Sequence, residues 1–203
     1  MLILTGNTGT ELIVKNSRFL AELTPVKTQA EARETLKLFK QKYADATHVV
    51  HAFITGNSAE IMGMSDDGEP AGTAGRPVMD VLKGRGVTNV ILTVTRWFGG
   101  TLLGTGGLVK AYGDAAKLVL DKAEEENLLE ENIPKDDFTF SVPYELYDKL
   151  KYSLKKLHIH NINEQFDSKI IISGQIETAE KDILTEMVTN LTNGKESVSF
   201  MNC

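Results

Sequence analysis

The residues best suited to hold an anion lie where a predicted strand runs through a glycine-rich turn into a predicted helix. The strand is expected over Val87–Phe98, the turn over Gly99–Gly107, and the helix continues to near Glu126. A helix N-terminus presents free backbone N–H groups and the positive end of the dipole, and glycine lets an anion approach closely. The candidate phosphate or nucleic-acid contacts in this turn are Gly104, Thr105, Gly106 and Gly107. Thr105 is the expected N-cap of the helix.

Two known phosphate-binding motifs are missing from this turn. A Walker loop needs Gly-Lys-Ser/Thr, and a dinucleotide fingerprint needs a third glycine three residues after Gly106. Twelve of the 17 glycines lie between Gly63 and Gly113, and such density is also typical of tight backbone packing. Anion binding and a plain tight crossover between strand and helix are therefore both open interpretations.

Positive charge gathers in the same part of a chain whose net charge is −6. Residues 70–113 contain one acid, Asp80, and five basic residues, Arg76, Lys83, Arg85, Arg96 and Lys110. A local basic segment in an acidic protein is typical of a surface that binds RNA or another phosphate-bearing partner. The alternative is that acidic side chains lie beside these residues in space and neutralise them.

Arg96, Trp97 and Phe98 end the predicted strand. Strand alternation puts Arg96 and Phe98 on one face and Trp97 on the other. An arginine at the end of a buried strand needs a partner, and Asp66, Asp67, Glu69 or a ligand would serve. Trp97 suits base stacking, but large aromatic side chains are more often packed in a core or a domain interface.

The loop that contains Asp66, Asp67 and Glu69 carries three carboxylates within four residues. Such a set is able to hold Mg²⁺ or Ca²⁺, although the spacing is not that of an EF-hand. Salt bridges or turn formation are the commoner use of such clusters. We expect no cofactor, and the metal site is kept as an open alternative for these three residues.

The histidines and the cysteine do not form a recognisable catalytic motif. His48 and His51 are three residues apart on a predicted strand, so they face opposite sides. Cys203 is the last residue of this sequence and a poor candidate nucleophile. We therefore assign no catalytic residue, and an enzyme is the less favoured hypothesis.

The elements predict an α+β protein with two domains. A Thr28-x-x-Glu31 capping box opens an amphipathic helix over Gln29–Tyr43, which precedes a predicted strand at Thr47–Thr55. A polar, proline-containing segment at 130–137 is the expected linker, so the domains are expected at 1–129 and 138–203. The second domain has the order βαββαβ, which is typical of a ferredoxin-like sandwich.

Composition and the N-terminus agree with a soluble, cytoplasmic protein. The lone cysteine excludes an internal disulfide, which is typical of a reducing compartment. MLILTGNTGTEL lacks the basic region of a signal peptide, and no apolar run is long enough for a membrane span. We expect no membrane partner and no DNA specificity.

Two long segments carry a family resemblance. SDDGEPAGTAGRPVMDVL at 65–82 and RWFGGTLLGTGGLVKAYGDAA at 96–116 closely resemble the two signature segments of the IMPACT/YigZ family. The flanking Asn16-Ser17-Arg18-Phe19 and Ala46-Thr47-His48 also fit, so the resemblance spans essentially the whole chain. It departs at Val49-Val50-His51, at Trp97 in place of tyrosine, and at Lys110 in place of arginine, which loses bidentate geometry.

The resemblance implies a fold and a link to translation. The N-terminal domain is expected to be like the second domain of a small-subunit ribosomal protein and like domain IV of elongation factor G. The C-terminal domain is expected to be like domain V of that factor. Eukaryotic members inhibit a starvation-responsive kinase by competing for its activator, and bacterial members have been proposed to bind nucleic acid or the ribosome.

Three hypotheses about function follow from the sequence and the resemblance. The first is a translation-associated regulatory protein that contacts RNA, the ribosome or a protein partner through the basic, glycine-rich surface. The second is an enzyme, a metal-assisted hydrolase or transferase, that uses the acidic loop and the turn at Gly104–Gly107 on a phosphate ligand. The third is a protein–protein module that uses the exposed sheet face of the C-terminal domain.

Overall fold

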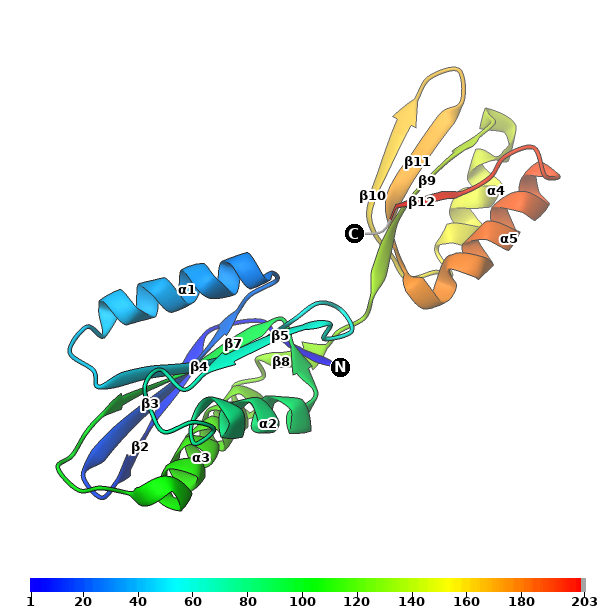
Figure 1. Cartoon of the computed structure of the whole chain (residues 1–203). Coiled ribbons are helices and arrows are strands. Elements are labelled where there is room, and N and C mark those ends of the chain that lie inside the picture. Colours follow the sequence, from blue (N-terminus) through cyan, green and yellow to red (C-terminus); the bar gives the residue numbers. More distant parts are fainter. Residues whose placement is uncertain (202–203) are drawn as a thin grey trace. The chain divides into compact units, whose positions relative to one another are not determined.

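The computed structural model describes residues 1–201, so Cys203 lies outside the described residues. The chain divides into two compact units, Met1–Asn132 and Ile133–Cys203 (Figure 1). Within the described part of the chain, no helix is both long enough and apolar enough to cross a membrane.

An antiparallel sheet of five strands organises the N-terminal unit. Its strand order is β2-β3-β7-β4-β5. The strands are β2 (Thr8–Val14), β3 (Ser17–Pro25), β4 (His48–Thr55), β5 (Ile61–Ser65) and β7 (Val90–Trp97). The predicted strand before the glycine-rich turn is present as β7, and it lies at the centre of this order. Asn89, at a φ of 55°, separates β7 from the short strand β6 (Val87–Thr88), so the long predicted strand is two strands.

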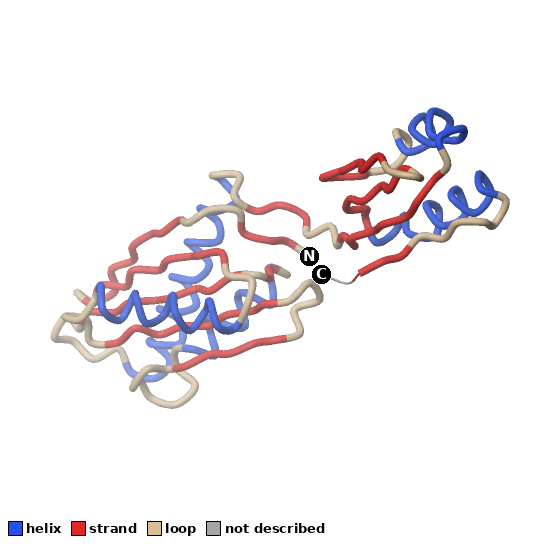
Figure 2. Tube along the Cα trace, turned by 90° about the horizontal axis from the view of Figure 1, so that it is seen from above, coloured by secondary structure: helices blue, strands red, loops and turns tan. Residues whose placement is uncertain are grey.

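Helices cover both faces of this sheet (Figures 1 and 2). One face packs on α2 (Gly75–Arg85) and α3 (Gly104–Glu125) through a core that includes Phe19, Leu92 and Val50. The opposite face packs on α1 (Gln29–Lys42) through a smaller cluster around Phe53 and Ile91. The predicted N-cap of α1 is confirmed, because the Thr28 side chain accepts a hydrogen bond from the Glu31 backbone N–H at 3.2 Å.

Trp97 lies on the α1 side of the sheet. Its ring packs edge-on against Tyr43, with 5.6 Å between centroids, and the Arg18 guanidinium lies 4.4 Å from its centroid. Its indole N–H donates to Asp45 at 2.9 Å. The tryptophan therefore joins the end of α1 to the sheet, and Arg96 and Phe98 lie on the other side, as predicted from strand alternation.

The N-terminal unit also contains a small sheet of three strands. Its strand order is β6-β1-β8, with β1 (Leu2–Leu4) and β8 (Leu129–Glu131) antiparallel to each other. Sequence patterning did not predict β1, because three residues are too few for a period to be seen. The expected linker at 130–137 begins within a strand, because β8 extends to Glu131.

The C-terminal unit has the predicted βαββαβ order. Its sheet runs β10-β11-β9-β12, and helices α4 and α5 supply apolar residues to its core, among them Leu150 and Leu184. The elements are β9 (Lys135–Val142), α4 (Tyr144–Leu154), β10 (Ile159–Phe166), β11 (Ile170–Glu177), the 3₁₀ turn Thr178–Glu180, α5 (Lys181–Thr192) and β12 (Ser199–Met201). This is the ferredoxin-like arrangement.

Candidate functional site

A buried polar cluster lies beneath the glycine-rich segment of the N-terminal unit. Arg96, which is 5% exposed, donates from Nη1 to Glu69 Oε1 at 2.7 Å. The hydroxyl of Tyr112 donates to the same carboxylate oxygen, also at 2.7 Å. Among the three acids that the sequence offered as partners for Arg96, the structure therefore selects Glu69.

Three elements bring this cluster together. Arg96 ends β7 on the side that faces α3, Tyr112 comes from α3, and Glu69 comes from the loop that precedes α2. Burial and the bond to Glu69 both raise the pKa of Tyr112, so its phenol stays neutral and acts as a donor. Tyr112 was missed as a polar residue, because its position on the apolar face of α3 predicts a core role alone.

Serine 17 extends the cluster to the neighbouring strand. Arg96 Nη2 donates to Ser17 Oγ at 3.3 Å, and the Gly99 backbone N–H donates to the same oxygen at 3.2 Å. The hydroxyl thus joins β3, β7 and the start of the glycine-rich turn. The sequence carries no signal that marks Ser17 for this role.

His48 lies at the edge of the cluster. Its Nδ1 is 2.8 Å from the backbone oxygen of Asp67. A carbonyl oxygen only accepts hydrogen bonds, so a neutral His48 ring carries its proton on Nδ1. Its Nε2 then carries the lone pair and lies 3.9 Å from Glu69 Oε1. His48 and His51 lie on opposite faces of β4, as predicted, since His48 pairs with Arg96 and His51 with Thr93 across the ladder.

The carboxylates of Asp66 and Asp67 are both engaged in hydrogen bonds within the N-terminal unit. Asp66 accepts hydrogen bonds from the backbone N–H groups of Gly72, Ala74 and Gly75 at 2.8, 3.1 and 2.8 Å. Asp67 accepts from the Val49 backbone and from Lys40, at 2.7 and 2.5 Å. Within residues 1–201 no group of three or more His, Cys, Asp or Glu residues is placed to hold a metal ion.

Asp66→Ala is expected to lower the free energy of unfolding by about 1–2 kcal/mol at neutral pH, because Asp66 caps the start of α2. Burial opposes ionisation of Asp66, but its three backbone donors outweigh burial and lower its pKa. A lowered folded pKa gives stability that is full above the unfolded value of about 3.9 and is lost as the pH falls through the folded value. Urea unfolding of both proteins across this range therefore shows the difference shrinking at acid pH, and a constant difference contradicts the assignment.

A cavity of about 400 Å³ opens above the polar cluster. Arg96, Glu69 and His48 contribute its polar part, and its apolar walls include Phe98, Leu102, Leu103 and Leu108. Phe98 and Leu102 are 46% and 82% exposed, so large apolar side chains stand at its mouth. The start of α3, at Gly104 and Thr105, completes the wall.

Helix α3 begins earlier than predicted, at Gly104, and this corrects the expected N-cap. The N-cap residue is Leu103, and Thr105 is the second residue within the helix. The Leu103 side chain makes no capping hydrogen bond to the first turn of the helix. Gly104 has a φ of +71°, a conformation that favours glycine and lets the chain enter the helix directly from the turn.

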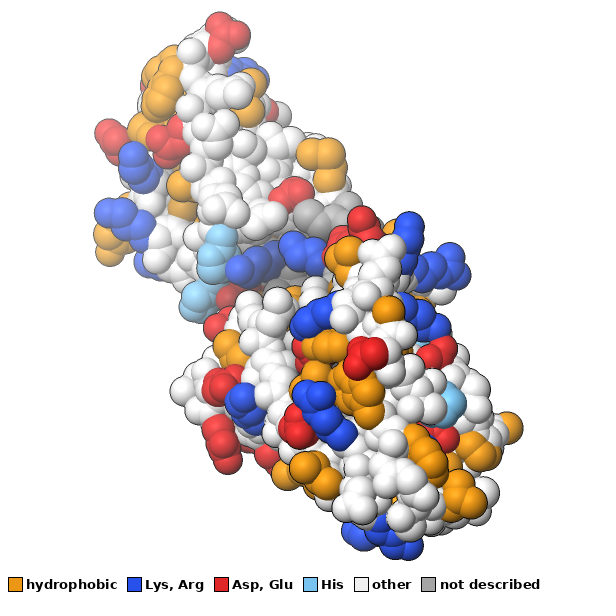
Figure 3. Space-filling view, turned by 90° about the vertical axis from the view of Figure 1, so that its left-hand side faces the viewer, with side chains coloured by type: hydrophobic (Ala, Val, Ile, Leu, Met, Phe, Trp, Pro, Cys, Tyr) orange, Lys and Arg blue, Asp and Glu red, His pale blue; other side chains and the backbone are white. Residues whose placement is uncertain are grey.

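The predicted basic residues do not gather at this cavity, except for Arg96. Arg76 pairs with Asp80, Lys110 pairs with Asp114, and Arg85 pairs with both Asp121 and Glu124. Lys83 has no ion pair within the described part of the chain. On the face shown in Figure 3, basic and acidic side chains of the N-terminal unit are interspersed.

The structure thus divides the predicted binding residues into two sets. Arg96, Gly104 and Thr105 line the cavity together with Glu69. The others are outside its lining, and they are Arg76, Lys83, Arg85, Gly106, Gly107 and Lys110. The cavity is therefore the place where the glycine-rich segment offers a recess with both polar and apolar walls.

Comparison with known proteins assigns both units to family models. Residues 15–120 match the Impact N-terminal domain, and residues 140–195 match a domain of unknown function, DUF1949. IMPACT family member YvyE of Bacillus subtilis is 34% identical over 192 residues, which cover 93% of this chain and 85% of that protein. IMPACT family member YigZ of Escherichia coli is 29% identical over 183 residues, covering 89% and 88%.

One solved structure matches along the whole chain. A crystal structure titled as a hypothetical protein has a TM-score of 0.67 and 27% identity, covering 100% of this chain and 96% of its own. A structure of the two-domain translational regulator Yih1 is also 27% identical, covers 59% and 46%, and has a TM-score of 0.37. The model match over the N-terminal domain and the identity with YvyE show that the chain belongs to the IMPACT family.

Proposed function

We propose that this chain is a translation-associated regulatory protein that acts by binding a component of the translation apparatus through the cavity of its N-terminal unit. The link to translation comes from the IMPACT family, whose members the sequence resemblance connects with translational control. The expected likeness to domains IV and V of elongation factor G points to the same role.

The observation that carries the proposal is the apolar mouth of the cavity. Phe98 and Leu102 expose large apolar surfaces beside a polar floor whose Arg96–Glu69 pair is already formed. Exposed apolar residues around a preformed recess are typical of a surface that receives a side chain of a protein partner. A protein of the translation apparatus is therefore favoured over naked RNA as the direct contact.

Contact with RNA or ribosomal phosphate is a separate form of the proposal, and it makes a different prediction. Phosphate contacts release counterions, so the logarithm of the binding constant falls with the logarithm of salt concentration by about 0.7 per contact for single strands. Most of the predicted basic residues are ion-paired to acids, which reduces what they offer to phosphate. A shallow salt dependence therefore supports a protein contact, and a steep one supports RNA.

Leu102→Asp is expected to weaken association with the translation apparatus about tenfold or more, because it places a charge at the apolar mouth. Leu102 is 82% exposed, so the variant is expected to fold normally. Cosedimentation with purified ribosomes and with the soluble factors of a translation extract measures the association. Protein synthesis in the same extract measures the regulatory effect.

Leu38→Asp is the matched control for this experiment. Leu38 lies on α1, is 60% exposed and is outside the cavity lining, so the same substitution is expected to leave binding unchanged. Undiminished association of Leu102→Asp, or no association of the unaltered chain with any translation component, overturns the proposal.

A phosphate-ligand enzyme is the second candidate, and one observation favours it. Glu69 and the start of α3 line the same cavity as Arg96, whose Nε is buried without a hydrogen-bond partner among residues 1–201. Asp66 and Asp67, which this hypothesis assigned to a metal, are instead bonded within the protein. Saturable hydrolysis of p-nitrophenyl phosphate that is lost in Glu69→Gln supports the enzyme, and no turnover above background rejects it for this substrate class.

A further inference from the structure

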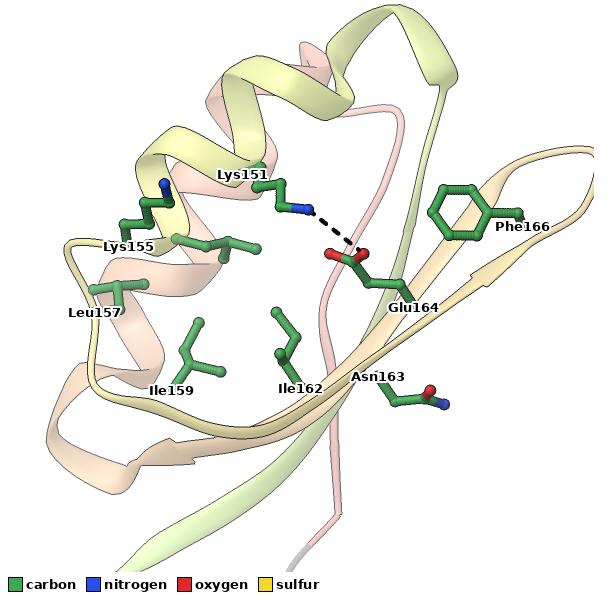
Figure 4. Close-up of a pocket in the computed structure, with 9 residues that line it drawn as sticks. Lys151, Lys155, Leu157, Ile159, Ile162, Asn163, Glu164 and Phe166 are labelled. Atoms are coloured by element: carbon green, nitrogen blue, oxygen red, sulfur yellow. Dashed lines mark ion pairs between the residues drawn. The ribbon is translucent and has the colours of Figure 1, made fainter.

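A groove in the C-terminal unit lies between α4 and β10, apart from the residues discussed so far. Its volume is about 570 Å³. Leu154, Leu157, Ile159 and Ile162 supply an apolar lining, and Phe166 lies at the far end of β10 (Figure 4). A volume of this size is in the range of ligand and side-chain pockets.

The strand that borders this groove has a free edge. In the described part of the chain, β10 pairs with β11 alone, and its outer edge carries no neighbouring strand. Ile162 and Phe166 are 49% and 59% exposed on this strand. Exposed edges are normally protected by charge or proline, and this edge has no proline and a single acid, Glu164. With two exposed apolar side chains beside a groove, it is a template for pairing with another chain.

The acidic residue of this edge is already neutralised. Glu164 accepts a hydrogen bond from the Tyr147 hydroxyl at 2.6 Å, and Lys151 Nζ lies 3.8 Å from the same oxygen (Figure 4). It therefore adds little negative charge to the groove. The ladder with β11 is regular from Asn163 to Phe166, after an irregularity that begins at His160.

The other wall of the groove is positively charged. Lys151 reaches from the last turn of α4 toward Glu164 (Figure 4), and Lys155, directly after the helix, also lines the groove. The stretch 149–156 contains four lysines and no acid, in a C-terminal half that is otherwise acidic. Lys155 has no ion pair among the described residues, so its charge is available to a partner.

We propose that this groove binds an extended, acidic segment of a partner protein by adding a strand to the edge of β10. Backbone groups of the segment pair with residues 163–166, and alternate apolar side chains enter the groove. A carboxylate of the segment meets Lys155, which has no ion pair among the described residues. A second copy of this chain is a poorer occupant, because β10 carries one acid, Glu164, which is already paired.

The test uses the full chain and a fluorescein-labelled peptide of alternating leucine and glutamate, about eight residues long to match a strand. Fluorescence polarisation is expected to show saturable binding that weakens as salt is raised. A control peptide of the same length, with lysine in place of each glutamate, is expected not to bind. Amide shift perturbation by NMR is expected over β10 and the end of α4.

Two pairs of variants make the assignment specific. Ile162→Asp and Lys155→Glu are each expected to weaken binding of the acidic peptide about tenfold or more. Ile171→Asp, at an exposed position that alternates with the buried Ile170 and Ile172 of β11, and Lys156→Glu, beside Lys155 but outside the lining, are expected to bind as the unaltered chain does.

Three outcomes overturn the proposal. The first is no binding of the acidic peptide, or equal binding of both peptides. The second is an equal loss in the variants and their controls, since this indicates a general charge effect. The third is concentration-dependent dimerisation of the unaltered chain that Ile162→Asp abolishes, since this assigns the edge to a second copy. Thermal unfolding of each variant checks that folding is intact.

Discussion

Arg96→Met is expected to lower the free energy of unfolding by about 3–5 kcal/mol, because it leaves a buried carboxylate without its countercharge. Glu69 is 8% exposed and would retain the Tyr112 hydroxyl as its close donor. Methionine fills much of the volume of the arginine stem, so lost charge pairing rather than a cavity dominates the change. Urea unfolding of both proteins at neutral pH measures the difference.

Arg76→Met is the control for this substitution. Arg76 forms an exposed pair with Asp80 four residues on, and such pairs contribute less than about 1 kcal/mol. The double variant Arg96→Met with Glu69→Leu is expected to recover part of the loss, because neither charge then remains buried. A loss below about 1 kcal/mol in Arg96→Met contradicts the role given to the cluster.

Gly99→Ala is expected to lower the free energy of unfolding by about 3 kcal/mol, near the upper end for overpacked sites. A Cβ at this position would lie 2.0 Å from the Asn16 carbonyl carbon and 2.3 Å from the Ser17 nitrogen. These are backbone atoms of the β2–β3 turn, so no side-chain rotation relieves the contact. Ser17 also accepts from Arg96, so the polar cluster is disturbed as well.

Gly106→Ala separates this steric effect from the general effect of adding a methyl group. A Cβ on Gly106 meets no atom of the described residues within 4 Å. Alanine is favoured over glycine in a helix by about 1 kcal/mol, so this variant is expected to be as stable as the unaltered chain or more stable. Equal losses in both variants contradict the close approach at Gly99.

Local sequence patterns predicted most of the elements, because each had a physical signal of its own. The Thr28 capping box gave the start of α1, and the run of β-forming residues gave β7. The start of α3 was placed too late, because the turn was expected to continue to Gly107. Strand β1 was missed, because its pairing with β6 and β8 supplies the stability that its length does not.

The candidate site was less predictable, because it depends on residues far apart in the chain. The position of Arg96 at the end of a buried strand predicted that it has a partner, but three acids were candidates. In the fold the partner is Glu69, 27 residues away. Arg85 counted as a free cation until its contacts with Asp121 and Glu124, more than 30 residues on, were known. Tyr112 carried no polar signal, since its hydroxyl meets Glu69 only after α3 packs on the sheet.

The position of Trp97 has a spectroscopic consequence. It is the one tryptophan of the sequence, and its ring contacts Tyr43 and Arg18 in the N-terminal unit. Intrinsic indole fluorescence is therefore a local reporter on that unit, whereas far-ultraviolet circular dichroism registers helices and strands of both. The fluorescence transition is expected to move in Arg96→Met and Gly99→Ala and to keep its midpoint in Ile162→Asp.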